Sequence, residues 1–104
     1  MKLWIGLAGL KPKPKCKRFG KGKGAYVHIA AWAESREAFE EHVKKRVDGL
    51  DCYLWDFDDV GLIEDRIKSG DFPDEFLDIQ SVAIRNPQDT VYGDFHVWER
   101  NDAN

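Results

Sequence analysis

Alternation of apolar and other side chains in three separate stretches of the chain is the feature that most constrains the fold. Residues 3–8, 25–32 and 90–98 each place an apolar residue at every second position, with Gly93 as one member of the last series. A period of two residues is the signature of an extended strand, because successive side chains of a strand point to opposite faces. The chain is therefore expected to build its core around a β-sheet.

One helix is predicted between the second and third strands. Ser35 is a favoured N-cap residue, and Phe39, Val43 and Val47 follow at spacings of four residues, which places them on one helical face. Gly49 is expected at the C′ position, where the left-handed conformation favours glycine. The pattern predicts an amphipathic helix that buries one apolar stripe.

Three further elements are predicted between the helix and the last strand. Residues 52–57 form a short stretch rich in aromatic side chains, which favours a third strand over another helix. Residues 60–67 fit a short helix or turn. Residues 74–85 carry apolar side chains at helical spacing and are followed by Pro87, so a second helix is expected there.

The order of these elements predicts the fold class. The chain has 104 residues, 42% of them hydrophobic, which suits one domain over residues 1–104. The predicted order is β-β-α-β-(α)-α-β, with short elements and no repeat. We expect an α+β domain with a four-stranded, mostly antiparallel sheet and helices on one face, in a ferredoxin-like arrangement.

Composition also predicts a cytoplasmic protein without a membrane contact. No apolar run approaches the roughly 18 residues that a membrane span needs. The apolar residues at the N-terminus end in alternating lysines and prolines rather than in a cleavage site, so they are expected to form a strand rather than a signal peptide. Cys16 and Cys52 show no metal-binding or redox spacing, and both are predicted to be thiols in a reducing compartment.

Charge is distributed unevenly along the chain. Residues 1–33 hold eight of the 16 bases and none of the 19 acids. Seven of those bases fall in residues 11–24, which also contain prolines and glycines and are expected to form a flexible basic loop that includes Lys21 and Lys23. Its glycines precede a strand rather than a helix, unlike those of a true phosphate-binding loop.

Aromatic side chains are expected to gather on one face of the sheet. If Leu3, Ile5 and Val27 face the helices, alternation sends a set of aromatic residues to the opposite face. That set holds all four tryptophans and comprises Trp4, Tyr26, His28, Trp32, Tyr53, Trp55, Tyr92, His96 and Trp98. Such a face needs a cover, which can be a second copy of the chain, a segment folded back, a partner protein, or stacked single-stranded nucleic acid.

Two groups of residues are candidates for chemistry. Asp56, Asp58 and Asp59 offer carboxylates for a metal, but no calcium loop accompanies them, and an acidic surface is the favoured interpretation. His28 and His96 lie on predicted strands and could support acid–base chemistry. Histidines packed among aromatic rings are favoured instead. No catalytic residue, metal or cofactor is assigned.

Two segments carry a resemblance to known proteins. The stretch Gly24-Ala-Tyr-Val-His-Ile-Ala-Ala-Trp-Ala-Glu-Ser35 and the closing Gly93-Asp-Phe-His-Val-Trp98 resemble strands of a family of small uncharacterised bacterial α+β proteins. In size and charge the chain also resembles the immunity proteins that accompany bacterial toxins. These resemblances imply a fold and a bacterial origin, but no residue-level chemistry.

Together these patterns favour a non-catalytic, immunity-like module in the bacterial cytoplasm, with a partner protein or a second copy of itself as ligand. One alternative is a nucleic-acid or phosphate-ligand binder that uses the basic loop and the aromatic face. Another is a small enzyme that uses His28 and His96. The predicted binding residues are Trp4, Tyr26, His28, Trp32, Trp55, His96, Trp98, Lys21 and Lys23.

Overall fold

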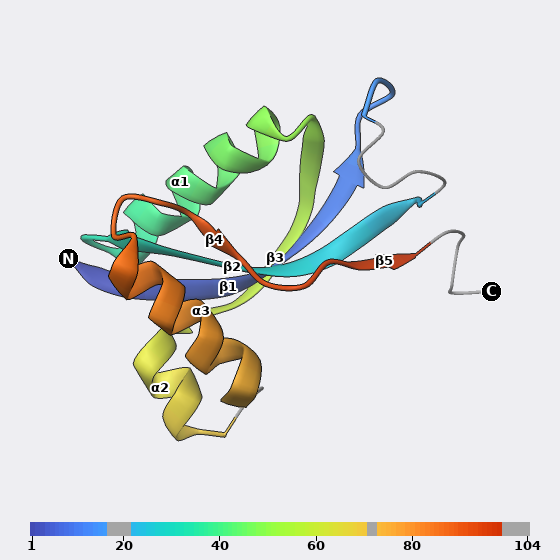
Figure 1. The fold of residues 1–104 in the computed structure, drawn as a ribbon. Coiled ribbons are helices and arrows are strands. Elements are labelled where there is room, and N and C mark those ends of the chain that lie inside the picture. The colour runs from blue at the N-terminus through green and yellow to red at the C-terminus, as the bar shows by residue number, and fades with distance from the viewer. Residues whose placement is uncertain (17–21, 71–72, 99–104) are drawn as a thin grey trace.

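A computed structural model describes residues 1–16, 22–70 and 73–98. Within those ranges the chain forms five strands and three helices around a single sheet (Figure 1). None of these helices has the length and apolar character needed to cross a membrane. In chain order the elements are β1 (Lys2–Pro12), β2 (Gly24–Ala33), α1 (Arg36–Gly49), β3 (Cys52–Leu62), α2 (Ile63–Lys68), α3 (Pro73–Arg85), β4 (Val91–Tyr92) and β5 (His96–Trp98).

The sheet is antiparallel throughout, which confirms the predicted α+β class. Its strand order is β3-β1-β2-β4, and β5 pairs with β2 beyond β4. The single last strand that the sequence predicted is in fact two short strands, β4 and β5, and both pair with β2. β1 and β3 are longer than predicted, and β1 takes up the first residues of the expected basic loop. Residues 17–21 of that loop, including Lys21, lie outside the described ranges.

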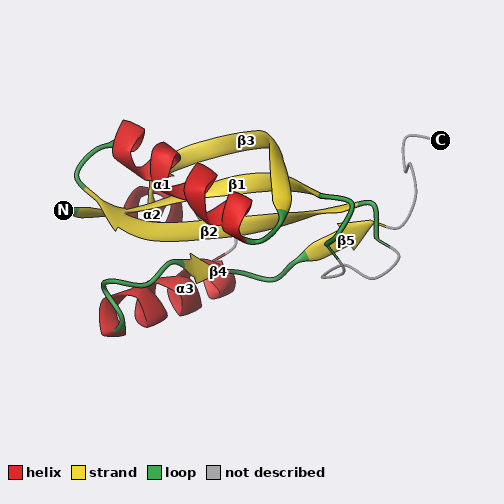
Figure 2. Cartoon of the chain, turned by 90° about the horizontal axis from the view of Figure 1, so that it is seen from above, coloured by secondary structure: helices red, strands yellow, loops and turns green. Residues whose placement is uncertain are grey.

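Helices cover both faces of the sheet, so the expected single helical layer of a ferredoxin-like arrangement is wrong. In Figure 1, α1 lies above the sheet and α3 below it. Val27 and Ile29 of β2 pack with α1, whereas Ala30, on the other side of the same strand, packs with Phe76 of α3. Both faces of β2 are therefore buried, and its alanines leave room for a helix on each side. Figure 2 shows α3 and β4 side by side at the β2 edge.

Two cores result from this arrangement. The core under α1 comprises Ala8, Leu10, Val27, Ile29, Ala31, Ala33, Phe39, Val43, Val47 and Cys52. The core against α2 and α3 comprises Leu3, Ile5, Ala30, Ile63, Phe76, Ile79, Ala83 and Val91. Burial of apolar side chains on both faces is the main stabilising contribution to a domain of this size.

The register between β1 and β2 corrects the expected aromatic face. Leu3 pairs with Trp32, and Trp4 pairs with Ala31. Directly paired residues share a face, so Trp4 points toward α1 and Trp32 points toward α3. The indole N–H of Trp4 donates to the carbonyl of Ala33 at 3.3 Å, and that of Trp32 donates to the carbonyl of Ala83 at 3.0 Å. The tryptophans therefore do not share one face.

α1 begins as predicted and ends two residues later than its sequence suggested. The Ser35 hydroxyl accepts a hydrogen bond from the Ala38 amide at 3.1 Å, and Phe39, Val43 and Val47 are buried. The left-handed residue after the helix is Asp51, with φ of 58°, rather than Gly49. Aspartate tolerates this conformation better than most residues with a β-carbon.

Candidate functional site

A cluster of aromatic and basic side chains lies on the half of the sheet that α2 and α3 leave without a helix. Figure 1 shows both helices beneath the end of the sheet near the N-terminus, away from β5. The strand pairings place Lys11 beside Tyr53 and Tyr26 beside His96 on one face. We call Lys11, Tyr26, Tyr53, Trp55 and His96 the open face. Tyr53 and Trp55 are 55% and 45% exposed.

Trp55 reaches this face through an irregularity in β3. Gly9 pairs with Asp56 and Leu10 pairs with Leu54, so Trp55 is the extra residue of a β-bulge. A β-carbon at Gly9 would lie 3.0 Å from the indole, so glycine is what allows the ring to lie against β1. The indole also packs on the ring of Tyr26, with centroids 5.8 Å apart. The position of Trp55 is thus fixed by packing on two strands.

Lysine side chains lie over the exposed rings. The Lys11 ammonium is 4.9 Å from the centroid of Trp55, and that of Lys13 is 5.4 Å from the centroid of Tyr53. Lys13 also pairs with the Asp48 carboxylate at 2.5 Å, and this hydrogen bond raises the pKa of Lys13 above its usual value. Lys23 is exposed just before β2.

Carboxylates lie on the same face as these lysines. Asp56 pairs with Gly9, and Asp58 pairs with Leu7, which itself lies opposite His28. The strand register therefore brings Asp56 and Asp58 onto the side that holds the open face. Positive and negative groups both surround the exposed aromatic rings.

His28 lies on the same side of β2 as Tyr26 but is buried beneath α3. Its Nδ1 is 2.7 Å from a carboxylate oxygen of Glu75, and its ring meets Phe76 edge-on with centroids 4.9 Å apart. His96 is exposed on β5. The structure thus places Glu75, rather than His96, beside His28. The prediction of a histidine packed among aromatic rings agrees with this environment.

Glu75 opens onto an acidic hollow between α3 and β4. The hollow has a volume of about 410 Å³ and is lined by Asp74, Glu75, Asp78, Ile79, Val82, Val91, Tyr92, Gly93 and Asp94. A β-carbon at Gly93 would lie 2.7 Å from the Glu75 carboxylate, and the Gly93 amide donates to the His28 carbonyl at 2.8 Å. Among the described residues, no three or more His, Cys, Asp or Glu side chains are placed to hold a metal ion.

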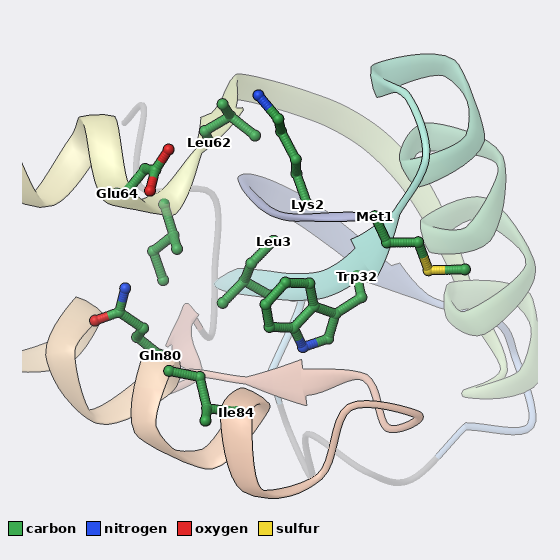
Figure 3. A pocket seen from close by; sticks show the side chains of 9 residues that line it. Met1, Lys2, Leu3, Trp32, Leu62, Glu64, Gln80 and Ile84 are labelled. Carbon is green, nitrogen blue, oxygen red and sulfur yellow. The ribbon is translucent and has the colours of Figure 1, made fainter.

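A second hollow, more apolar than the one between α3 and β4, lies near the N-terminus between the sheet and helices α2 and α3 (Figure 3). It has a volume of about 290 Å³ and is lined by Met1, Lys2, Leu3, Trp32, Leu62, Ile63, Glu64, Gln80 and Ile84. Figure 3 shows the Trp32 indole facing Leu3, with Glu64 and Gln80 on the neighbouring helices. The sequence did not predict this hollow, because its walls come from separate segments that only the fold brings together.

His42 of α1 contacts the residue that precedes β4. Its Nε2 lies 2.6 Å from the Thr90 hydroxyl oxygen, and its side chain is half-buried. Burial lowers the pKa of His42 below 6.5, and the positive charges of Arg46 and Lys45 lower it further.

Only some of the predicted binding residues lie together on the open face. Tyr26, Trp55 and His96 do, whereas Trp4, His28 and Trp32 are held by α1 or α3, and Lys21 lies outside the described ranges. Trp98 pairs with Gly24 at the end of the sheet. The sequence missed Glu75 entirely.

The fold and the open face define an α+β domain whose antiparallel sheet is covered by helices on one face and on half of the other. No protein-family model, curated protein or solved structure matches the chain.

Proposed function

We propose that this protein is a non-catalytic module that binds a partner protein through its open face. The observation that carries the proposal is the exposure of Tyr53 and Trp55 beside Tyr26 on a half of the sheet without a helix. Tryptophan and tyrosine are the residues that most often anchor protein interfaces. Trp55 packs on Tyr26 and lies under Lys11, and Lys13 lies over Tyr53, so these contacts reduce the side-chain entropy that a partner would cost the rings on binding.

Charge favours a protein over nucleic acid as the ligand. Lys13 is already paired with Asp48, and Asp56 and Asp58 face the same side as the aromatic rings. A phosphate backbone approaching this face would meet those carboxylates. An interface between proteins instead accommodates both signs of charge at its rim.

An immunity-like role is one form of this proposal. Residues 56–78 include many of the acids of the chain, and an acidic surface would speed association with a basic toxin. In this form the module acts in the bacterial cytoplasm and neutralises its partner by occupying it. A second copy of the chain is the other protein that could cover the open face.

The nucleic-acid alternative has one observation in its favour. Lys11 lies over the Trp55 ring, and stacking aromatics combined with lysines also occur in proteins that bind single strands. Binding of that kind weakens steeply as salt concentration rises. Salt dependence and the nucleic-acid content of the purified protein therefore distinguish the two functions.

The test combines solution mass with capture of partners by matched variants. Light scattering on the purified protein reports self-association, and ultraviolet absorbance reports co-purified nucleic acid. Wild type, Trp55→Ala and Leu77→Ala are then used to capture proteins from the source cells. Leu77 is 47% exposed on α3, away from the open face, and serves as the control.

We expect one protein, or the chain itself, to bind wild type and the Leu77 variant alike. Binding to Trp55→Ala should be at least roughly tenfold weaker. Equal binding by both variants would place the interface elsewhere. Recovery of nucleic acid whose binding is lost with Trp55 would establish the alternative function instead.

A further inference from the structure

The two cysteines of the chain meet at one backbone carbonyl. The Cys16 thiol donates to the Leu50 carbonyl oxygen at 3.8 Å, and the Cys52 thiol donates to the same oxygen at 3.5 Å. Their sulfur atoms can be no farther apart than these two distances laid end to end. Cys52 is buried in the core under α1, and Cys16 packs against that core while remaining half-buried.

Backbone hydrogen bonds bring the two residues together. The Lys13 amide donates to the Asp51 carbonyl at 2.9 Å, which ties the end of β1 to the start of β3. A turn then returns the chain, with the Cys16 amide donating to the Lys13 carbonyl at 2.8 Å. Cys16 is therefore placed beside Cys52 by the ends of two paired strands, and the approach does not depend on residues outside the described ranges.

We infer that Cys16 and Cys52 are a site of reversible disulfide formation, with a low-molecular-weight disulfide as the oxidant. The Cys16 thiolate attacks one sulfur of that disulfide, which forms a mixed disulfide and releases one small thiolate. The Cys52 thiolate then attacks the Cys16 sulfur, which forms the Sγ–Sγ bond and releases the second small thiolate.

This step balances in atoms and electrons. The two cysteines are oxidised by two electrons, and the small disulfide is reduced to two thiols, which take up the two protons that the cysteines lose. Exposure sets the order, because Cys16 is half-buried and accessible, whereas Cys52 is 1% exposed. Cys16 is the attacking residue and Cys52 resolves the mixed disulfide.

The bond would link the oxidation state of the cell to the region beside the open face. Cys52 immediately precedes Tyr53, and Lys13, which lies over Tyr53, belongs to the turn that ends at Cys16. A disulfide would fix this turn covalently to β3 and would restrict the unfolded chain. This inference concerns the cysteines alone and stands or falls independently of what the open face binds.

The experiment treats the folded protein with glutathione disulfide and glutathione at a series of ratios, without denaturant. Intact mass then reports the loss of two hydrogen atoms. Digestion after lysine and arginine without reduction should leave residues 16–17 joined to residues 47–66, the peptides that hold the two cysteines. The oxidised chain should also unfold at a higher urea concentration than the reduced chain.

Two variants assign the order of the steps. Cys52→Ser should accumulate glutathione on Cys16, because the resolving thiol is gone, and Cys16→Ser should form no bond and react slowly. The wild-type chain decides the matter even if a variant folds poorly. A stable glutathione adduct on wild-type Cys16, covalent dimers of the chain, or a bond that forms only in urea would each overturn the inference.

Discussion

Glu75 of α3 holds His28 of β2 through a carboxylate oxygen that lies 2.7 Å from the ring nitrogen Nδ1. Both side chains are largely shielded from water, with 20% and 6% of their areas exposed. An ionised carboxylate only accepts hydrogen bonds, so it pairs with the His28 tautomer that carries a proton on Nδ1. This contact joins α3 to β2 beside the core residues Phe76, Ile79 and Ala83.

Removing the carboxylate should destabilise the fold. Glu75→Ala takes this acceptor from a buried imidazole, and we expect it to cost about 1–3 kcal/mol of the free energy of unfolding. Glu75→Gln retains an acceptor oxygen and should cost less. Urea unfolding followed by circular dichroism measures both, and Asp78→Ala, exposed on the same helix, is the control. If Glu75→Ala and Asp78→Ala have the same free energy of unfolding, the contact between Glu75 and His28 contributes nothing to stability.

Gly93 should be coupled energetically to Glu75. In wild type, Gly93→Ala would bring a β-carbon to 2.7 Å from the Glu75 carboxylate and displace it from His28. In a Glu75→Ala background that clash is absent, so the same substitution should cost less. A double-mutant cycle in urea should therefore give a coupling energy of about 0.5 kcal/mol or more. If the free-energy costs of Gly93→Ala and Glu75→Ala simply add, the close approach of these two residues is contradicted.

Gly9 should control the position of Trp55. Gly9→Ala places a β-carbon 3.0 Å from the indole and from the Asp56 β-carbon, so the ring must shift. We expect the Trp55 indole N–H resonance to move and the free energy of unfolding to fall by about 1–3 kcal/mol. Gly61→Ala, on the same strand pair with open space around its β-carbon, is the matched control. An unmoved indole signal in the Gly9 variant would refute the close approach.

Partner binding should follow the same substitution. If the open face is the interface, Gly9→Ala should weaken capture of the partner, because it moves the anchoring ring, while Gly61→Ala should leave capture unchanged. Titration of the captured partner against both variants measures the effect. Unchanged affinity in a Gly9 variant whose indole has moved would exclude Trp55 as an anchor.

His42 should make stability depend on pH. Its pKa is lowered in the folded chain relative to the usual 6.5, first by burial and then by Arg46 and Lys45. As pH falls below about 6.5 the unfolded chain takes up a proton before the folded chain does, so stability falls until the lower folded pKa is passed. Urea unfolding from about pH 8 to about pH 5 should show a smaller loss in His42→Gln than in wild type. If stability falls equally with pH in wild type and in His42→Gln, the lowered pKa of His42 does not contribute to the pH dependence.

Local patterns in the sequence predicted most of the secondary structure. Ser35 and the Phe39, Val43 and Val47 stripe specify α1 through a cap and a helical period, which involve only neighbouring residues. The period-two pattern of β1 and β2 likewise depends on the geometry of each strand alone. The helix over residues 74–85 was also predicted, and it begins one residue earlier, at Pro73.

What the tertiary structure decided is which faces come together. Alternation divides each strand into two sides, but it does not say which side of β1 joins which side of β2, and both sides of β1 carry apolar residues. The register that pairs Leu3 with Trp32 sent Trp4 and Trp32 to different helices. The contact of Glu75 with His28 and the meeting of Cys16 with Cys52 at Leu50 join residues far apart in the chain. Such contacts form only when the whole sheet is assembled, because their free energy comes from long-range packing rather than from local conformational preference.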